Sequence, residues 1–156
     1  MFCVLGIFEK PQVLSESGFS GRHMGTAYRL KVFGTFRFTR ANGEEVRISS
    51  KRGKCLIVSL LLSEDWSRDR FWLQDFLWPD RPKEHASLSL RQELRNLRKL
   101  LGEGLFVSED TRVRLNQDLV ANRPFEERAI GEELLEGVSL QGPLEEWVHN
   151  LSLIHI

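Results

Sequence analysis

An amphipathic stretch in the middle of the chain, from Pro82 or Lys83 to Leu101, constrains the fold most strongly. Its apolar residues recur every three or four positions, and on a helical wheel they point within about 40° of their mean direction. Glycines follow at 102 and 104, which is typical of a helix end. The stretch therefore predicts a long helix with one buried stripe, formed by Ala86, Leu90, Leu94, Leu97 and Leu101.

The opposite side of this predicted helix carries positive charges and amides. An ordinary solvated helix face usually mixes both signs, but Glu93 is the only acid after Glu84, and it points toward the apolar side. In the major groove of DNA, arginine can read guanine and glutamine or asparagine can read adenine, while lysine meets phosphate. The pattern favours a helix that binds duplex DNA, through the arc formed by Arg91, Gln92, Arg95, Asn96, Arg98 and Lys99.

Strands are expected before this helix and a hairpin after it. Apolar residues alternate with polar ones between Tyr28 and Thr39, and the alternation breaks at Gly34, which predicts two short strands. A turn at 41–43 leads to a third strand, EVRIS. Beyond the helix, LFVS and TRVRL flank Glu109 and Asp110 as a hairpin. Its outward arginines, 112 and 114, suit a backbone contact, although the two acids at the tip would oppose a phosphate.

Two further helices are expected between the strands and the long helix. Ser49 or Ser50 can cap the first, which runs to about Ser63 and is apolar nearly all round, so it belongs in the core. Cys55 lies in this run and is expected to be a small core residue. Asp69 can cap the second helix, RFWLQDFLW, which Pro79 ends. The predicted fold class is α+β.

The charge of the chain is unevenly spread. The 22 Lys and Arg balance the 22 Asp and Glu, but residues 24–118 hold 18 basic and 13 acidic residues, whereas residues 119–150 hold 2 and 7. A basic middle followed by an acidic segment predicts two functional segments, with the polyanion-binding one in the middle.

Motifs for catalysis, metal binding or membrane insertion are missing from the sequence. It has no GxxxxGK[ST] loop, no HExxH and no CxxC, and its apolar runs are shorter than the roughly 18 residues of a membrane span. Among the four histidines only His85 is a credible catalyst, and at the start of the long helix a phosphate contact suits it better. We expect a cytoplasmic protein that is not an enzyme and has no cofactor, no metal and no membrane partner.

The order of these elements resembles the OmpR-type winged-helix domain, in the version at the front of the Streptomyces antibiotic regulatory proteins and related bacterial activators. The resemblance covers Tyr28 to Asn116, and LWPDRP and SLRQELRNLRKLLG are its most specific parts. The later stretch GEELLEGVSLQGPLEEWV resembles the start of the bacterial transcriptional activator domain, a helical repeat domain.

This resemblance implies a winged helix-turn-helix with an N-terminal antiparallel sheet, three helices and a C-terminal β-hairpin wing. It implies promoter binding with the third helix in the major groove, as a dimer or tandem copies on direct repeats, and RNA polymerase as a further partner. Leu88 departs from the pattern, because polar or basic residues are common there. By position, the recognition surface would consist of Arg91, Gln92, Arg95, Asn96, Arg98 and Lys99, the wing contacts of Thr111 and Arg112, and the phosphate contacts of Arg70 and Trp78.

The expected organisation has four parts: a non-native leader (1–23), a winged-helix domain (24–118), the start of a truncated helical activator domain (119–150) and a tail (151–156). The tail, LSLIHI, is what a transposase adaptor used in library preparation encodes. An alternative function is a winged helix that serves as a protein-interaction module at the front of a larger signalling protein. The all-positive arc favours DNA over this alternative, because a protein-binding surface has no reason to keep these groups facing one way.

Overall fold

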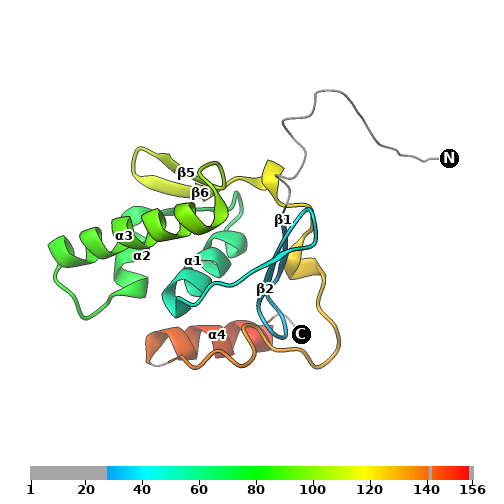
Figure 1. Ribbon diagram of the computed structural model, residues 1–156. Coiled ribbons are helices and arrows are strands. Elements are labelled where there is room, and N and C mark those ends of the chain that lie inside the picture. Colours follow the sequence, from blue (N-terminus) through cyan, green and yellow to red (C-terminus); the bar gives the residue numbers. More distant parts are fainter. Residues whose placement is uncertain (1–27, 141, 155–156) are drawn as a thin grey trace, which may run out of the picture.

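The computed structural model describes residues 28–140 and 142–154, which fold into helices and two small antiparallel sheets (Figure 1). This mixed composition is compatible with the α+β class expected from the sequence. The leader expected at residues 1–23, the start expected at Met24 and the last two residues lie outside the described part. Within the described part, no helix is long and apolar enough to cross a membrane.

The first sheet has the strand order β1-β2-β3, with β1 (Tyr28–Lys31), β2 (Arg37–Arg40) and β3 (Glu45–Val46). Leu30 pairs with Phe38, and Phe38 pairs with Val46, so that these three side chains form the buried face of the sheet. The third strand is shorter than EVRIS, because the backbone leaves the ladder after Val46 and leads to the cap of the first helix.

The helices α1 (Lys51–Leu62) and α2 (Arg70–Leu77) begin at the expected caps. The Ser50 hydroxyl accepts from the N–H of Gly53 at 2.9 Å, and the Asp69 carboxylate accepts from the N–H groups of Phe71 and Trp72. These bonds satisfy backbone donors that the first turn of a helix leaves without partners. Helix α1 lies at the centre of the core, and Cys55 is fully buried within it, as predicted.

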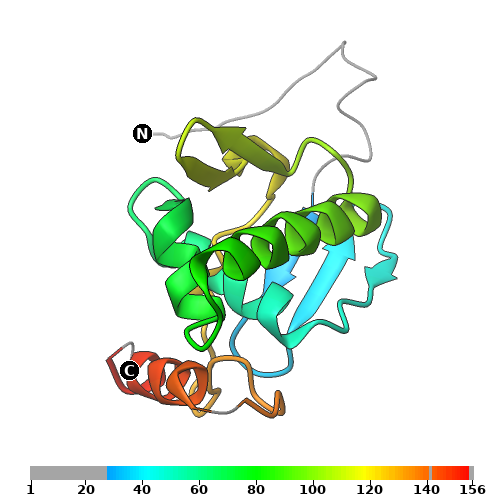
Figure 2. The ribbon, with the colours of Figure 1, turned by 90° about the vertical axis from the view of Figure 1, so that its left-hand side faces the viewer.

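Helix α3 (Lys83–Leu101) is the longest helix of the described chain, and Gly102 follows it with a positive φ of 105°. The five residues predicted to form its buried stripe are all buried. Helix α3 lies against α2 and α1, and Figure 2 shows α3 from the side. The predicted phase of the helix is therefore confirmed, and this phase decides which side chains face outward.

The second sheet joins the hairpin to a strand between α1 and α2. Its order is β4-β6-β5, with β4 (Ser67–Asp69), β5 (Phe106–Glu109) and β6 (Arg112–Leu115). Val113 and Leu115 are fully buried, as predicted for the inner face of the hairpin. Strand β4 was not predicted, because three residues are too short to show periodicity. It anchors the hairpin to the start of α2.

Residues 117–140 and 142–154 pack back onto the same core. They contain two short 3-10 turns, η2 (Gln117–Leu119) and η3 (Pro124–Glu126), and helix α4 (Pro143–Ile154), which includes part of the expected tail. Both ribbon views place α4 at the opposite end of the molecule from the β5–β6 hairpin (Figures 1 and 2). The buried members of this segment in the common core are Leu134, Leu135, Leu140, Leu144 and Val148.

Candidate nucleic-acid interface

The outward side of α3 carries five exposed polar side chains, here called the α3 face. They form two neighbouring rows, because residues four apart on a helix lie one above the other. One row is cationic and the other contains amides. The α3 face consists of Arg91, Arg95 and Lys99 in the first row and Gln92 and Asn96 in the second.

The cations of the α3 face have no counter-charge. Within residues 28–140 and 142–154, no hydrogen bond or ion pair joins the side chain of Arg91, Arg95 or Lys99 to another residue. Five cations elsewhere in the fold are paired with neighbouring acids, in the pairs Arg29–Glu127, Lys31–Glu132, Arg37–Glu45, Arg40–Glu44 and Arg114–Glu109.

Repulsion within the cationic row lowers the stability of the helix, and only Lys99, in the last turn, gains from the negative C-terminal end of the helix. Like charges four residues apart on a helix each cost about 0.2–0.5 kcal/mol, and the cationic row contains two such pairs, 91 with 95 and 95 with 99. A row of positive charges that the fold does not need is the electrostatic pattern of a surface that meets a polyanion.

Arg98 lies beside the cationic row, but its guanidinium has internal partners. Its Nη2 donates to the carbonyl of Phe106 at 3.2 Å and to the hydroxyl of Ser108 at 2.8 Å. Both acceptors are in β5, so Arg98 joins α3 to the hairpin. In this structure Arg98 therefore fixes the position of the hairpin relative to the α3 face.

Arg70 brings a further positive charge to the same side, from the first position of α2. Burial lowers the pKa of its guanidinium, and the positive charges of Arg91 and Arg98 lower it further. Arginine stays protonated in proteins, so three guanidinium groups from two helices contribute to one region of positive potential. The backbone N–H of Arg70 donates to the carbonyl of Thr111 at 2.8 Å, which holds the hairpin tip near the start of α2.

The hairpin presents fewer free cations than the sequence suggested. Arg112 donates from Nε and Nη2 to the Ser67 hydroxyl, at 3.0 and 2.8 Å, and from Nη2 to the Ser67 carbonyl at 3.1 Å. Arg114 pairs with Glu109 at 3.1 Å. Thr111 is exposed at the tip, next to Asp110, whose φ is 45°. The exposed Thr111 and the backbone of the tip thus remain available to a ligand.

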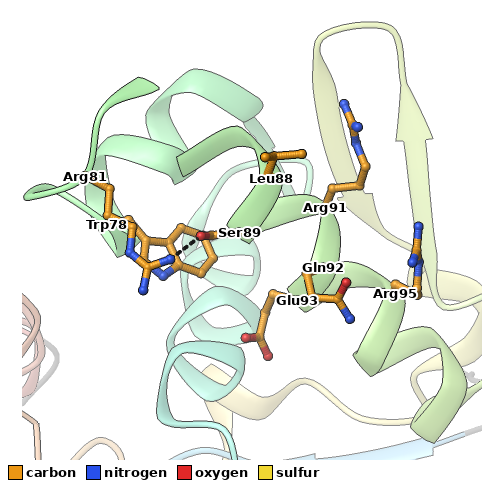
Figure 3. Close-up of a pocket in the computed structure, with 8 residues that line it drawn as sticks. All are labelled: Trp78, Arg81, Leu88, Ser89, Arg91, Gln92, Glu93 and Arg95. Carbon is orange, nitrogen blue, oxygen red and sulfur yellow. Dashed lines mark hydrogen bonds between the residues drawn. The ribbon is translucent and has the colours of Figure 1, made fainter. Parts of the chain in front are cut away.

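Trp78, expected to meet phosphate, is almost completely buried, with 5% of its surface exposed. The Arg52 guanidinium lies over its ring, 5.8 Å from the centroid. The ring helps to line an open pocket between the α2–α3 turn and α3, drawn in Figure 3. Little of the indole is left for a ligand, so Trp78 acts mainly as a packing residue.

The same pocket contains Arg81, which the sequence analysis did not select as a contact, and Leu88, whose departure from the family pattern could mean contact with a thymine methyl or with another protein. Arg81 donates to the hydroxyl of Ser89, and Leu88 is 58% exposed beside Arg91 (Figure 3). Arg81 could have been selected from the sequence, because it is a cation in the turn before a basic helix. Its hydrogen bond to α3 could not have been predicted, because the bend between α2 and α3 creates it.

The described residues contain no group of three His, Cys, Asp or Glu side chains that could hold a metal ion. The buried thiol of Cys55 has a pKa raised to about 12 by desolvation.

Comparison with known proteins gives one informative similarity. No protein-family model matches the chain. Over 83 residues, which are 53% of this chain, it is 35% identical to "Regulatory protein AfsR" of Streptomyces coelicolor (strain ATCC BAA-471 / A3(2) / M145). The matched stretch is 8% of that protein, so this chain spans a small part of its relative. The similarity supports a relationship with a regulatory protein.

Proposed function

We propose that this chain contains the DNA-binding part of a bacterial transcriptional regulator and that it binds double-stranded DNA with sequence preference. The observation that carries the proposal is the unneutralised cationic row of the α3 face, Arg91, Arg95 and Lys99. In this proposal the fold is a winged helix-turn-helix. Helix α3 enters the major groove, and the β5–β6 hairpin is the wing that meets the phosphate backbone or the minor groove.

The construction of α3 supports this assignment. A helix of 19 residues is about 28 Å long, and the major groove is wide enough to accept an α-helix. Because the buried leucine stripe fixes the rotation of α3, its amides and arginines are held outward without rearrangement. Arg98 ties α3 to β5, which would let helix and wing engage one duplex as a unit.

The partners proposed with this function are promoter DNA and the transcription machinery. The resemblance to Streptomyces regulators suggests binding as a dimer or as tandem copies on direct repeats, with RNA polymerase as a further partner. The similarity to a protein named as regulatory supports this context.

A protein-interaction module is the second candidate, and two exposed apolar side chains favour it. Phe71 is 59% exposed at the start of α2, and Leu88 is 58% exposed on α3. An apolar surface of this kind could contact another protein. The two candidates differ in the salt dependence of binding. DNA binding that neutralises four to six phosphates gives a plot of log K against log salt concentration with a slope of about −4 to −5.

The test is the affinity of the full chain for duplex DNA from its own upstream region and for a scrambled duplex, across a salt series. We expect salt-steep binding that prefers the upstream duplex. Arg95→Ala should weaken binding to the preferred site by about 1–3 kcal/mol and relax sequence preference.

Arg29→Ala is the matched control. It removes one exposed arginine of the β1 strand that already pairs with Glu127 at 3.7 Å, so binding should stay close to that of the parent. Failure of the parent to bind any duplex at low salt would favour the protein-interaction module. Equal losses in the two variants would contradict a special role of the α3 face.

A further inference from the structure

A hydrogen bond joins the two side chains of the amide row of the α3 face and leaves them with different free donors and acceptors. Nε2 of Gln92 donates to Oδ1 of Asn96 at 3.0 Å, and both side chains are exposed. They lie four residues apart, one turn above the other. The bond already restricts the rotamers of the Gln92 side chain. Less conformational entropy therefore remains to be lost when Gln92 contacts a ligand.

The donors and acceptors left over differ between the two amides. A glutamine amide has two N–H donors and a carbonyl oxygen. After the bond to Asn96, Gln92 keeps one N–H and its Oε1. Adenine presents the matching pair in the major groove, the N7 acceptor and the N6 amino donor, side by side. Asn96 has given part of its acceptor capacity to Gln92, and its remaining N–H groups can only donate.

The cations next to Gln92 and Asn96 would attract this side of α3 to the phosphates of DNA. Arg91 and Arg95 flank Gln92 in the adjacent row and have no partner within the described chain. In Figure 3 the Gln92 amide lies next to the stem of Arg95 and below Arg91, while both guanidinium groups extend away from the amide and Glu93 points to another side of the helix. The charges that would anchor α3 against a duplex thus lie in the row next to one ordered amide.

Resting on the DNA-binding function proposed above, we infer that Gln92 reads one adenine of the target sequence by a bidentate contact and that Asn96 is its positioning residue. Gln92 Oε1 accepts from the adenine N6 amino group, and the free Nε2–H donates to N7. The preferred site therefore contains an adenine that is contacted by Gln92 and by no other side chain of α3.

The experiment starts from duplexes that the full chain selects from a random library. In the selected site each adenine is replaced in turn by 7-deazaadenine, which lacks the N7 acceptor, or by purine, which lacks the N6 amino group. At one adenine, each replacement should weaken binding by the parent about 5- to 10-fold. Gln92→Ala should bind the unmodified site about as weakly and lose no further affinity on either replacement. Arg29→Ala should keep the full sensitivity.

Two substitutions at 96 separate positioning from general structure. Asn96→Ala removes the bond to Gln92, so the discrimination between adenine and its analogues should shrink. Asn96→Asp keeps an acceptor for Gln92 Nε2 but adds a negative charge, so overall affinity should fall while the discrimination survives. Both residues are exposed, and thermal unfolding of all variants should match the parent.

The inference is overturned if Gln92→Ala keeps the parent's sensitivity to both analogues, or if no adenine in the selected site is sensitive to them. It also fails if Asn96→Asp and Asn96→Ala lose discrimination equally. A chain that selects no duplex at all contradicts the proposed function instead, so the two failures are distinguishable.

Discussion

Burial at the scale of one residue determines the chemistry of Cys55. It has no exposed surface, and desolvation raises the pKa of its thiol from 9.0 to about 12, although Arg52 and Lys54 act in the opposite direction. A group whose pKa is raised by folding stabilises the folded state fully below its unfolded pKa. This contribution is lost as the pH rises through the folded value.

We therefore expect alkaline pH to destabilise the parent more steeply than Cys55→Ala. Between pH 9 and 12 the parent should lose about 1.4 kcal/mol more per pH unit, although Cys55→Ala is less stable at neutral pH because it leaves a cavity. Urea unfolding at pH 7, 9 and 10.5 measures the difference, with Cys3→Ser in both proteins so that Cys55 is the only thiol of the parent and the variant has none. Parallel pH profiles would show that the thiol ionises as easily in the folded state as in the unfolded one.

The residues of the α3 face could be predicted, since a helical wheel needs only the sequence. The internal partners of Arg98 and Arg112 could not, because Phe106 and Ser67 reach these arginines only when helix, hairpin and β4 assemble. Trp78, for which the resemblance implied a phosphate contact, is buried because the α2–α3 bend and Arg52, which lies far away in sequence, cover its ring.

At the scale of the element, the buried stripe of α3 determines which side of the helix can face DNA. Leu97 is 2% exposed and Leu100 is 39% exposed, although they are one turn apart. Leu97→Ala should lower the free energy of unfolding by about 2–5 kcal/mol, whereas Leu100→Ala should lower it by about 1 kcal/mol or less. Thermal or urea unfolding measures both. Equal losses would mean that α3 is rotated from the position described here.

The helix boundaries could be predicted best, because Ser50, Asp69 and Gly102 cap their helices through local interactions that need no tertiary contact. Strands were less predictable. The third strand was expected from EVRIS, but β3 is only two residues long, and the three-residue β4 shows no pattern of its own because its hydrogen bonds come from a distant partner strand.

At the scale of the whole molecule, the acidic segment after Asp118 covers an otherwise open sheet edge. Strand β1 is at the edge of its sheet, and the N–H of Ala121 donates to the Tyr28 carbonyl at 2.6 Å while the N–H of Leu135 donates to the Val32 carbonyl at 2.8 Å. This cover could not be predicted, because residues 119–140 form isolated bridges and turns without periodicity. An uncovered edge would be free to pair with another chain.

Asn122 is central to this cover, because its side chain bonds both backbone groups of Leu30 as a neighbouring strand would. Its Oδ1 accepts from the Leu30 N–H at 3.0 Å, and its Nδ2 donates to the Leu30 carbonyl at 2.7 Å and to Glu127 Oε1 at 3.0 Å. Asn122→Ala leaves buried backbone groups without partners and should cost about 1–3 kcal/mol. Asn42→Ala, which removes one exposed turn contact to the Glu44 N–H, should cost about 0.5 kcal/mol or less.

Hydrogen exchange distinguishes this role from a general loss of stability. In Asn122→Ala the Leu30 amide should exchange faster than the amides of α3, because only the edge of β1 opens, and duplex binding should be retained, since the α3 face is formed by other elements. An Asn122→Ala protein as stable as the Asn42→Ala control, with a protected Leu30 amide, would show that residues 119–140 do not hold the sheet edge.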